Sequence, residues 1–316
     1  MVDTAHRRAI FLALIVTALW STSWVIIRFG LDDEGLRPLT FAGVRYLIAG
    51  LVLLGACVVG PRTRQSLKAV QGRELLFLAG FGLVIVAIAQ GGQFVAIANQ
   101  PAATTSLVVS FTPLLVVAAS GRSLDEWATL PQVIGAMLVV GGAILYFVGA
   151  LEATLVGMTA AIIALLGNSA GSVINRGTHR SGMRSPLITT GVSMTAGAIV
   201  LVIVGLVVEG MPTFTPRGIA YILWLALVNG SLAWWMWNLA HRHLTAAESS
   251  VIGSLMLVLI SAQGWIFLDE QPSGVQIVGI LLVTAGIIWS QLRGRRGGAV
   301  APTVAAVVGT PPPPPR

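Results

Sequence analysis

Residues 102–143 read AATTSLVVSFTPLLVVAASGRSLDEWATLPQVIGAMLVVGGA, and residues 246–287, 144 positions further on, read AAESSVIGSLMLVLISAQGWIFLDEQPSGVQIVGILLVTAGI. Fourteen of these 42 aligned positions are identical, and most of the others exchange one apolar residue for another. The identities include an Asp-Glu pair and two glycines at one offset: Asp125-Glu126 with Asp269-Glu270, Gly135 with Gly279, and Gly142 with Gly286. Chance similarity between apolar segments does not reproduce such a set. The chain therefore contains an internal repeat, which the fold must accommodate.

The composition places this repeat in a lipid environment. Charged residues make up 10% of the chain and apolar residues 55%, with a mean hydropathy of +0.86. An ordinary soluble domain has about 25% charged residues, so this chain lacks the polar side chains needed to cover a surface in water. The net charge of +7 is not gathered into a basic face or an aromatic-interleaved basic stretch. We therefore expect the lipid bilayer as a partner, and no nucleic acid.

Cysteine and histidine usage gives no indication of a metal or redox site. Cys57 is the single cysteine and lies in an apolar run, while the four histidines fall at the ends of apolar segments. A disulfide framework and a cysteine metal site are excluded by this count. We expect no metal and no cofactor.

Ten stretches are long and apolar enough to cross a bilayer, which takes about 20 residues. They must be helical, because backbone groups that face lipid have to be satisfied within their own segment. The expected spans are 9–30, 38–60, 74–98, 102–120, 127–149, 154–175, 186–208, 217–240, 246–268 and 274–292. The run after Arg7-Arg8 is too long for a signal peptide and is interpreted as a retained first span. The predicted fold is an all-α, polytopic membrane protein.

The basic residues predict the orientation. If the N-terminus lies inside, 15 Lys and Arg residues fall on the inner side, and the outer side receives four: Arg28, Arg37, Arg45 and Arg217. Because cytoplasmic loops carry the excess of basic residues, we expect a protein of the cytoplasmic membrane with both termini in the cytoplasm. Residues 1–8 then form a cytoplasmic N-terminus, and 293–316 a disordered, proline-rich cytoplasmic tail.

The repeat offset divides the ten spans into two halves of five, residues 9–150 and 151–292. An odd number of spans inverts the second half, so that Asp125-Glu126 faces the inside and Asp269-Glu270 the outside. A pseudo-two-fold axis in the membrane plane would relate the halves. Such symmetry favours alternating access, in which one half rocks against the other around a shared site.

Several short motifs recur in order along roughly residues 9–292: Trp20 to Trp24, Pro38 with Arg45, Ala102-Ala103, Ser106, Pro113, Leu124-Asp125-Glu126 and Gly135, then Ala246-Ala247-Glu248-Ser249, Leu268-Asp269-Glu270, Gly279 and Gly286. In order, spacing and duplication they resemble the EamA-type domain of the drug/metabolite transporter superfamily. The resemblance implies ten helices, two inverted five-helix halves and export or exchange of small metabolites or drugs. Leu257 stands where Pro113 would recur, a departure from the family pattern, so we expect the ninth span to be straighter than the fourth.

Polar and aromatic side chains within the spans are the candidates for a substrate site, since such groups face a cavity or a partner helix. The candidate substrate-binding residues are Trp20, Trp24, Gln90, Gln93, Asn168, Asn229, Trp234 and Asn238. Trp20 and Trp24 lie four residues apart, as do Trp234 and Asn238, and each pair shares a helix face. Ordinary packing of the indoles and hydrogen bonding between helices by the amides remain open alternatives. The helical glycines, among them Gly135, Gly141-Gly142, Gly279 and Gly286, are interpreted as points of tight packing.

Two charged residues are candidates for gating or charge pairing. Arg45 enters the second span, where it could snorkel to the interface or meet a substrate carboxylate or an acidic residue of the other half. Glu248 is the carboxylate expected to approach the inner ends of the eighth and ninth spans. The spans contain no titratable carboxylate near the membrane centre, so we expect facilitated transport or exchange with weak or no proton coupling.

The expected function is secondary transport of a small metabolite, amino acid or drug-like amphipathic solute, as efflux or exchange. A nucleotide sugar or phosphorylated cargo is an alternative that calls for more inward-facing cations than Arg45. A polytopic membrane enzyme would need a nucleophile with a base, paired intramembrane aspartates or a metal cluster, and a channel would need a ring of charges or carbonyls; neither pattern is present. The sequence does not determine the oligomeric state, and it is compatible with a monomer.

Overall fold

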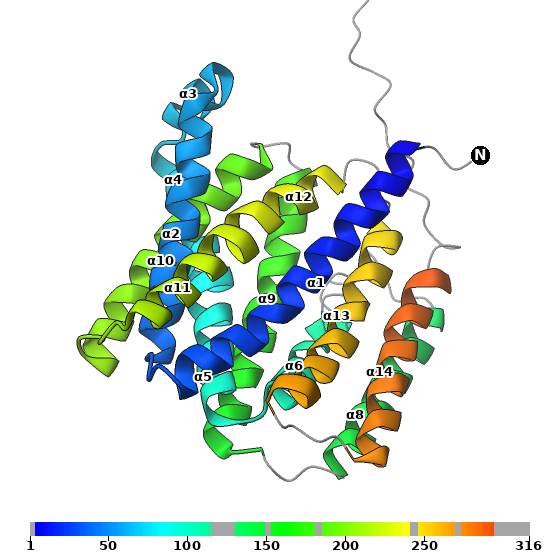
Figure 1. Ribbon diagram of the computed structural model, residues 1–316. Helices are drawn as coiled ribbons and strands as arrows, with labels where there is room; N and C mark the ends of the chain where they lie inside the picture. Colours follow the sequence, from blue (N-terminus) through cyan, green and yellow to red (C-terminus); the bar gives the residue numbers. More distant parts are fainter. Residues whose placement is uncertain are drawn as a thin grey trace, which may run out of the picture.

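The computed structural model describes residues 4–112, 114–115, 130–148, 153–180, 185–240, 246–268 and 273–293. The regular structure in these ranges is helical, as predicted, and Figure 1 shows long helices running side by side in a bundle. In chain order the elements are α1 (Thr4–Asp32), α2 (Pro38–Val59), α3 (Pro61–Lys68), α4 (Gly72–Gly82), the π-helical η1 (Leu83–Ile88), α5 (Ala89–Asn99), α6 (Ala102–Val109), α8 (Leu130–Val148), α9 (Leu155–Arg180), α10 (Pro186–Glu209), α11 (Pro216–Trp224), the π-helical η2 (Leu225–Leu232), α12 (Ala233–Ala240), α13 (Ala246–Phe267) and α14 (Gly274–Arg293).

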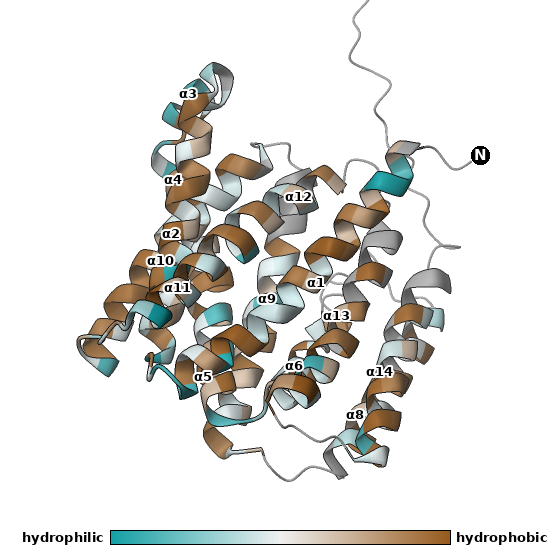
Figure 2. Ribbon diagram, in the orientation of Figure 1, coloured by the Kyte–Doolittle hydropathy of each residue, from teal (hydrophilic) through white to brown (hydrophobic). Residues whose placement is uncertain are grey.

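Six helical segments in the described ranges are long and apolar enough to span a membrane: Ala5–Asp32, Pro38–Val59, Gly72–Asn99, Leu155–Ile174, Leu187–Glu209 and Pro216–Trp237. They coincide with the first, second, third, sixth, seventh and eighth expected spans. Shorter apolar stretches within α8, α13 and α14 coincide with the fifth, ninth and tenth. The expected span 102–120 extends beyond the described residues, so the number ten stays a prediction. Apolar residues dominate these helices, and hydrophilic ones gather at α3 and at helix ends (Figure 2).

Two boundaries differ from the sequence prediction. The first helix begins at Thr4, so residues 4–8 of the expected cytoplasmic N-terminus are helical. Arg7 and Arg8 are exposed on this turn, which shows that a helix can continue past its apolar run into water. The second difference is α3, a polar helix within the expected connection, which has Pro61 in its first turn, where the missing N–H costs no hydrogen bond.

The repeated glycines bring α8 and α14 together (Figure 1). A Cβ on Gly142 would lie 2.6 Å from the carbonyl oxygen of Gly279, and a Cβ on Gly286 would lie 2.6 Å from that of Gly135. The two helices are antiparallel. The repeat relates Gly142 to Gly286 and Gly279 to Gly135, so it converts the first contact into the second. A two-fold axis perpendicular to the helices produces this pattern, as inverted halves require. The tight packing predicted for Gly142, Gly279 and Gly286 is thus confirmed.

The pair α2 and α10 is arranged in the same way. A Cβ on Gly43 would lie 2.7 Å from the backbone nitrogen of Val202, and a Cβ on Gly191 would lie 3.4 Å from that of Leu54. Gly43 and Gly191 are 148 positions apart, as are Leu54 and Val202 (191 − 43 and 202 − 54). Equivalent positions of the two halves therefore make equivalent contacts here as well. Their separation in the sequence is 148 residues, four more than the 144 of the repeat that begins at residue 102.

Both the third and the eighth span contain a π-helical segment, η1 and η2. Each such segment holds one residue more per turn than an α-helix and often lies at a functional site. In η2 the hydroxyl of Ser231 donates to the carbonyl of Ala226, 3.2 Å away, and lies 3.3 Å from the carbonyl oxygen of Ala49 on α2. The widened backbone of the eighth span is thereby tied to the second span.

Candidate functional site

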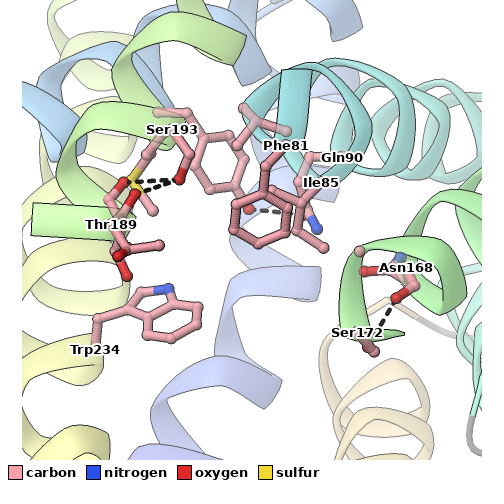
Figure 3. A pocket seen from close by; sticks show the side chains of 13 residues that line it. Phe81, Ile85, Gln90, Asn168, Ser172, Thr189, Ser193 and Trp234 are labelled. Atoms are coloured by element: carbon pink, nitrogen blue, oxygen red, sulfur yellow. Dashed lines mark hydrogen bonds between the residues drawn. The ribbon is translucent and has the colours of Figure 1, made fainter. Parts of the chain in front are cut away.

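A cavity of ≈ 230 Å³ lies between helices of both halves. The first half contributes side chains from α2, α4, η1 and α5, and the second half from α9, α10 and α12. The lining residues are Tyr46, Phe81, Ile85, Val86, Gln90, Asn168, Gly171, Ser172, Thr189, Thr190, Ser193, Met194 and Trp234. Figure 3 shows Trp234 and Thr189 on one side of the cavity, with Asn168 and Ser172 across from them.

The first-half wall offers a hydrogen-bond donor. The hydroxyl of Tyr46 donates to Oε1 of Gln90 at 2.7 Å, which fixes the orientation of the amide. Its nitrogen Nε2 is then available to an acceptor on a bound solute. Phe81 and Ile85 stand beside this amide and provide an apolar surface (Figure 3).

The second-half wall offers both acceptors and donors, and the donors of Asn168, Ser172 and Ser193 are bonded within their own helices. Nδ2 of Asn168 donates to the carbonyl of Ala164 at 2.9 Å, which leaves Oδ1 of the amide as an acceptor. The hydroxyl of Ser172 donates to the carbonyl of Asn168 at 2.8 Å, and that of Ser193 to the carbonyl of Thr189 at 2.6 Å. The indole of Trp234 adds an aromatic surface. This combination suits a small solute that has both apolar and hydrogen-bonding groups.

The structure brings three of the predicted substrate-binding residues, Gln90, Asn168 and Trp234, together on the cavity wall. Gln93, which lies on the same helix as Gln90, is half-buried and does not line the cavity. The side chains of Asn238 on α12 and Glu248 on α13 lie outside the described part of the structure, so their predicted roles stay predictions.

Trp20 and Asn229 connect α1 to the eighth span, away from the cavity wall. Nε1 of Trp20 donates to the carbonyl oxygen of Asn229 at 2.9 Å, and Nδ2 of Asn229 donates to the carbonyl of Leu19 at 2.5 Å. The Trp20 ring centroid lies 5.8 Å from that of Trp234 and 5.2 Å from that of Trp237. Trp20 thus packs against Trp234, which lines the cavity. Trp20 and Asn229 therefore contribute bonding and packing between helices.

Trp24 also lies off the cavity wall. It is 4% exposed and belongs to the main hydrophobic core with Ile27 and Phe94. Its shared helix face with Trp20 therefore contributes packing.

Arg45 is buried within the bundle with 5% of its surface exposed. Its guanidinium carbon lies 4.5 Å from the ring centroid of Tyr46 and 5.7 Å from that of Phe94. The alternative that this side chain snorkels to the interface is wrong, because a snorkelling cation would be exposed to water. The cation instead rests on the ring of a residue that lines the cavity.

Sequence reasoning missed several residues of the wall, chiefly Tyr46, Thr189, Ser193 and Met194. Thr189, Thr190 and Ser193 lie within about one helical turn near the start of the mostly apolar seventh span, and this signal was available in the sequence. No signal in the sequence indicated that Tyr46 lines a cavity, because a tyrosine beside an arginine near a helix start is also typical of the membrane interface.

At one end of the bundle, hydrogen bonds link the two halves. The Glu209 carboxylate at the end of α10 accepts hydrogen bonds from the backbone nitrogens of Leu39 at 2.7 Å and Thr40 at 2.9 Å, and from the Thr40 hydroxyl at 2.8 Å. A carboxylate at a helix N-terminus satisfies free N–H groups and matches the helix dipole. Nearby, Glu34 accepts a hydrogen bond from Thr215 and pairs with Arg217. We call Glu209 with Leu39 and Thr40 the carboxylate clasp.

Comparison with known proteins gives consistent matches along the chain. A sequence model of the EamA-like transporter family matches residues 7–148 and again residues 154–291. A crystal structure of a protein 17% identical in sequence superimposes with a TM-score of 0.67, covering 91% of this chain and 98% of that one, which shows a shared fold.

Three named relatives match nearly end to end. Protein PecM of Dickeya dadantii is 26% identical over 87% of this chain and 90% of its own length. A "probable terminal-alkyne amino-acid exporter" of Streptantibioticus cattleyicolor is 25% identical over 93% of this chain and 98% of its own. A "probable amino-acid metabolite efflux pump" of Salmonella typhimurium is 24% identical, with 89% and 94% covered.

Proposed function

The chain belongs to the EamA-like transporter family, and from that premise we propose that it is a secondary transporter of the cytoplasmic membrane. Its cargo is a small amphipathic solute, such as an amino-acid-like metabolite or a drug-like molecule, which it moves by alternating access. The two five-helix halves, residues 9–150 and 151–292, pivot about the cavity between them. Both termini lie in the cytoplasm.

The observation that carries this proposal is the composition of the cavity wall. Gln90 of the first half supplies a donor, Asn168 of the second half supplies an acceptor, and Trp234 supplies an aromatic surface. A solute bound there would contact both halves at once, so its release would be coupled to their relative movement. The wall residues within the described ranges include no charged side chain, which disfavours a phosphorylated cargo.

The carboxylate clasp defines which side is closed. With the N-terminus inside, the end of α1, the start of α2 and the end of α10 lie on the outer side, so Glu209 holds the outer ends of the two halves together. On this proposal the outer side is the closed one in this conformation. The names of the amino-acid exporter and efflux-pump relatives support the outward direction of transport.

Binding to the purified full-length protein tests the proposal. We expect an amphipathic member of a panel of amino acids, drug-like amines and sugar phosphates to raise the melting temperature and to be taken up by proteoliposomes. Trp234→Ala should weaken binding about tenfold, or about 1.4 kcal/mol, through the lost aromatic contact. The matched control is Trp235→Ala, because Trp235 is the next residue along and is 53% exposed on the lipid side.

Equal effects of Trp234→Ala and Trp235→Ala on binding would place the cargo elsewhere. Selective binding of the sugar phosphates would replace the proposed cargo by the phosphorylated class.

A further inference from the structure

Arg45 is a cation buried deep in the bundle without a carboxylate partner in the described part of the protein. It is 5% exposed, and its Nε atom has no hydrogen-bond partner. Two ion pairs among the described residues join Arg28 to Asp32 and Arg217 to Glu34. The guanidinium of Arg45 takes part in neither pair.

Arg28, near the end of α1, is half-buried and has polar partners. Arg28 pairs with Asp32 at 2.6 Å and also donates to the backbone carbonyls of Ile97 and Gln100. A buried ion is stable when it is paired and hydrogen-bonded in this way. Arg45 has in place of such partners the faces of Tyr46 and Phe94, and a cation–π contact offsets only part of the desolvation of a buried ion.

The uncompensated charge lies directly behind the cavity. Tyr46 presents one face of its ring to the guanidinium, while its hydroxyl bonds to Gln90 on the cavity wall. Phe94, the second ring under the cation, is one helical turn from Gln90 on the same face of α5. The ring of Tyr46 therefore contacts the guanidinium and also forms part of the cavity wall. In a low-dielectric interior a charge acts strongly over such a distance.

We propose that Arg45 is the counter-charge for a carboxylate on the cargo, so that the transporter selects amphipathic monocarboxylates, amino acids included. This inference rests on the proposed transport function and narrows its cargo. The carboxylate binds at the Tyr46–Gln90 edge of the cavity, where Nε2 of Gln90 donates to it and Arg45 stabilises its negative charge. Asn168 and Trp234, across the cavity, receive the rest of the molecule. Among the described residues Arg45 has no carboxylate partner, and the cargo would complete the pair.

The test compares each acid with its own amide on the purified full-length protein. The probes are L-phenylalanine and L-phenylalaninamide, L-tryptophan and L-tryptophanamide, and indole-3-acetate and indole-3-acetamide. We expect at least one acid to bind, and its amide to bind at least about tenfold more weakly, because the amide lacks the charge. In Arg45→Gln the acid should lose this advantage, and Arg45→Lys should retain most of it. Arg217→Gln, which removes an exposed arginine, should leave the preference unchanged.

The ligand-free melting temperature separates this role from a structural one. If the cargo is the missing partner, Arg45→Gln should melt at the same or a higher temperature than the wild type, since it removes an unpaired buried charge. A lower melting temperature, or amides that bind wild type as well as the acids, would overturn the inference. The proposed function would survive that result if an uncharged or cationic solute still bound and Trp234→Ala still weakened its binding. Binding of no solute of any class would overturn both.

Discussion

At the scale of single residues, neighbours in the sequence have opposite surroundings. Trp234 faces the cavity, and Trp235 points to lipid with 53% of its surface exposed. Helical periodicity predicts that the two tryptophans diverge, but it cannot say which faces inward in a span that is apolar all round. Gln90, Asn168 and Trp234, which were singled out by their polar or aromatic character within a span, lie on the cavity wall. Trp20, Trp24 and Asn229 carry the same signal but form contacts between helices, because polar and aromatic residues occur both on cavity walls and at helix contacts.

Asn229 gives a prediction at this scale. Its side chain is 1% exposed and joins the eighth span to the carbonyl of Leu19 on α1. Asn229→Ala should lower the free energy of unfolding by about 1 kcal/mol, the usual size of a hydrogen bond between membrane helices, while cargo affinity stays within about twofold. Thermal melting and ligand binding in the same detergent check both parts.

The control for Asn229→Ala is Asn99→Ala, because Asn99 is exposed and its side-chain amide donates within its own helix, to the carbonyl of Val95. If Asn229→Ala weakened cargo binding strongly without a loss of stability, Asn229 would belong to the binding site after all.

At the scale of helices, the repeat predicted which segments correspond but not how they pack. The glycines of α8 and α14 were found because both copies of the repeat share one offset of 144 residues. The correspondence of Gly43 with Gly191 was not found, because these two residues are 148 positions apart. The π-helical segments η1 and η2 could not be predicted, because an extra residue in a turn is stabilised by tertiary contacts such as that of Ser231 with Ala49. The polar helix α3 has too few apolar residues to stand out from a loop.

Adjacent glycines on α8 provide a matched pair of variants. Gly142→Ala would place a methyl group 2.6 Å from the backbone oxygen of Gly279, and Gly141→Ala would place one 3.8 Å from a side-chain carbon of Leu282. Backbone cannot move aside as a side chain can, so Gly142→Ala should cost about 1–3 kcal/mol of stability and Gly141→Ala close to none. Melting temperatures and the yield of monodisperse protein measure the difference. Similar losses for both variants would mean that α8 and α14 are not in close contact.

At the scale of the whole molecule, the carboxylate clasp joins the halves at one end. Removing its charge should favour the state in which this end opens, because Glu209→Gln loses charge-assisted hydrogen bonds to Leu39 and Thr40 worth about 1.5–3 kcal/mol. A cysteine replacing Ser172 on the cavity wall, in a Cys57→Ser background, should then react faster with a membrane-impermeant maleimide added from outside.

Glu74→Gln is the control for the clasp, since Glu74 lies in the first turn of α4 at the opposite end. If Glu209→Gln left the labelling rate of the cysteine at position 172 unchanged, the clasp would not be what holds the outer side closed.

The central claim, that two inverted halves face each other across the membrane, is tested most directly by labelling equivalent connections. Single cysteines replace Asp33, between α1 and α2, and its second-half counterpart Ser185, between α9 and α10; Gln71, before α4, and Met211, before α11, form the second pair. All four positions are exposed. On intact cells a membrane-impermeant maleimide should label positions 33 and 211 and leave 71 and 185 unlabelled until the membrane is permeabilised. Labelling of both members of a pair from the same side would contradict the inverted arrangement.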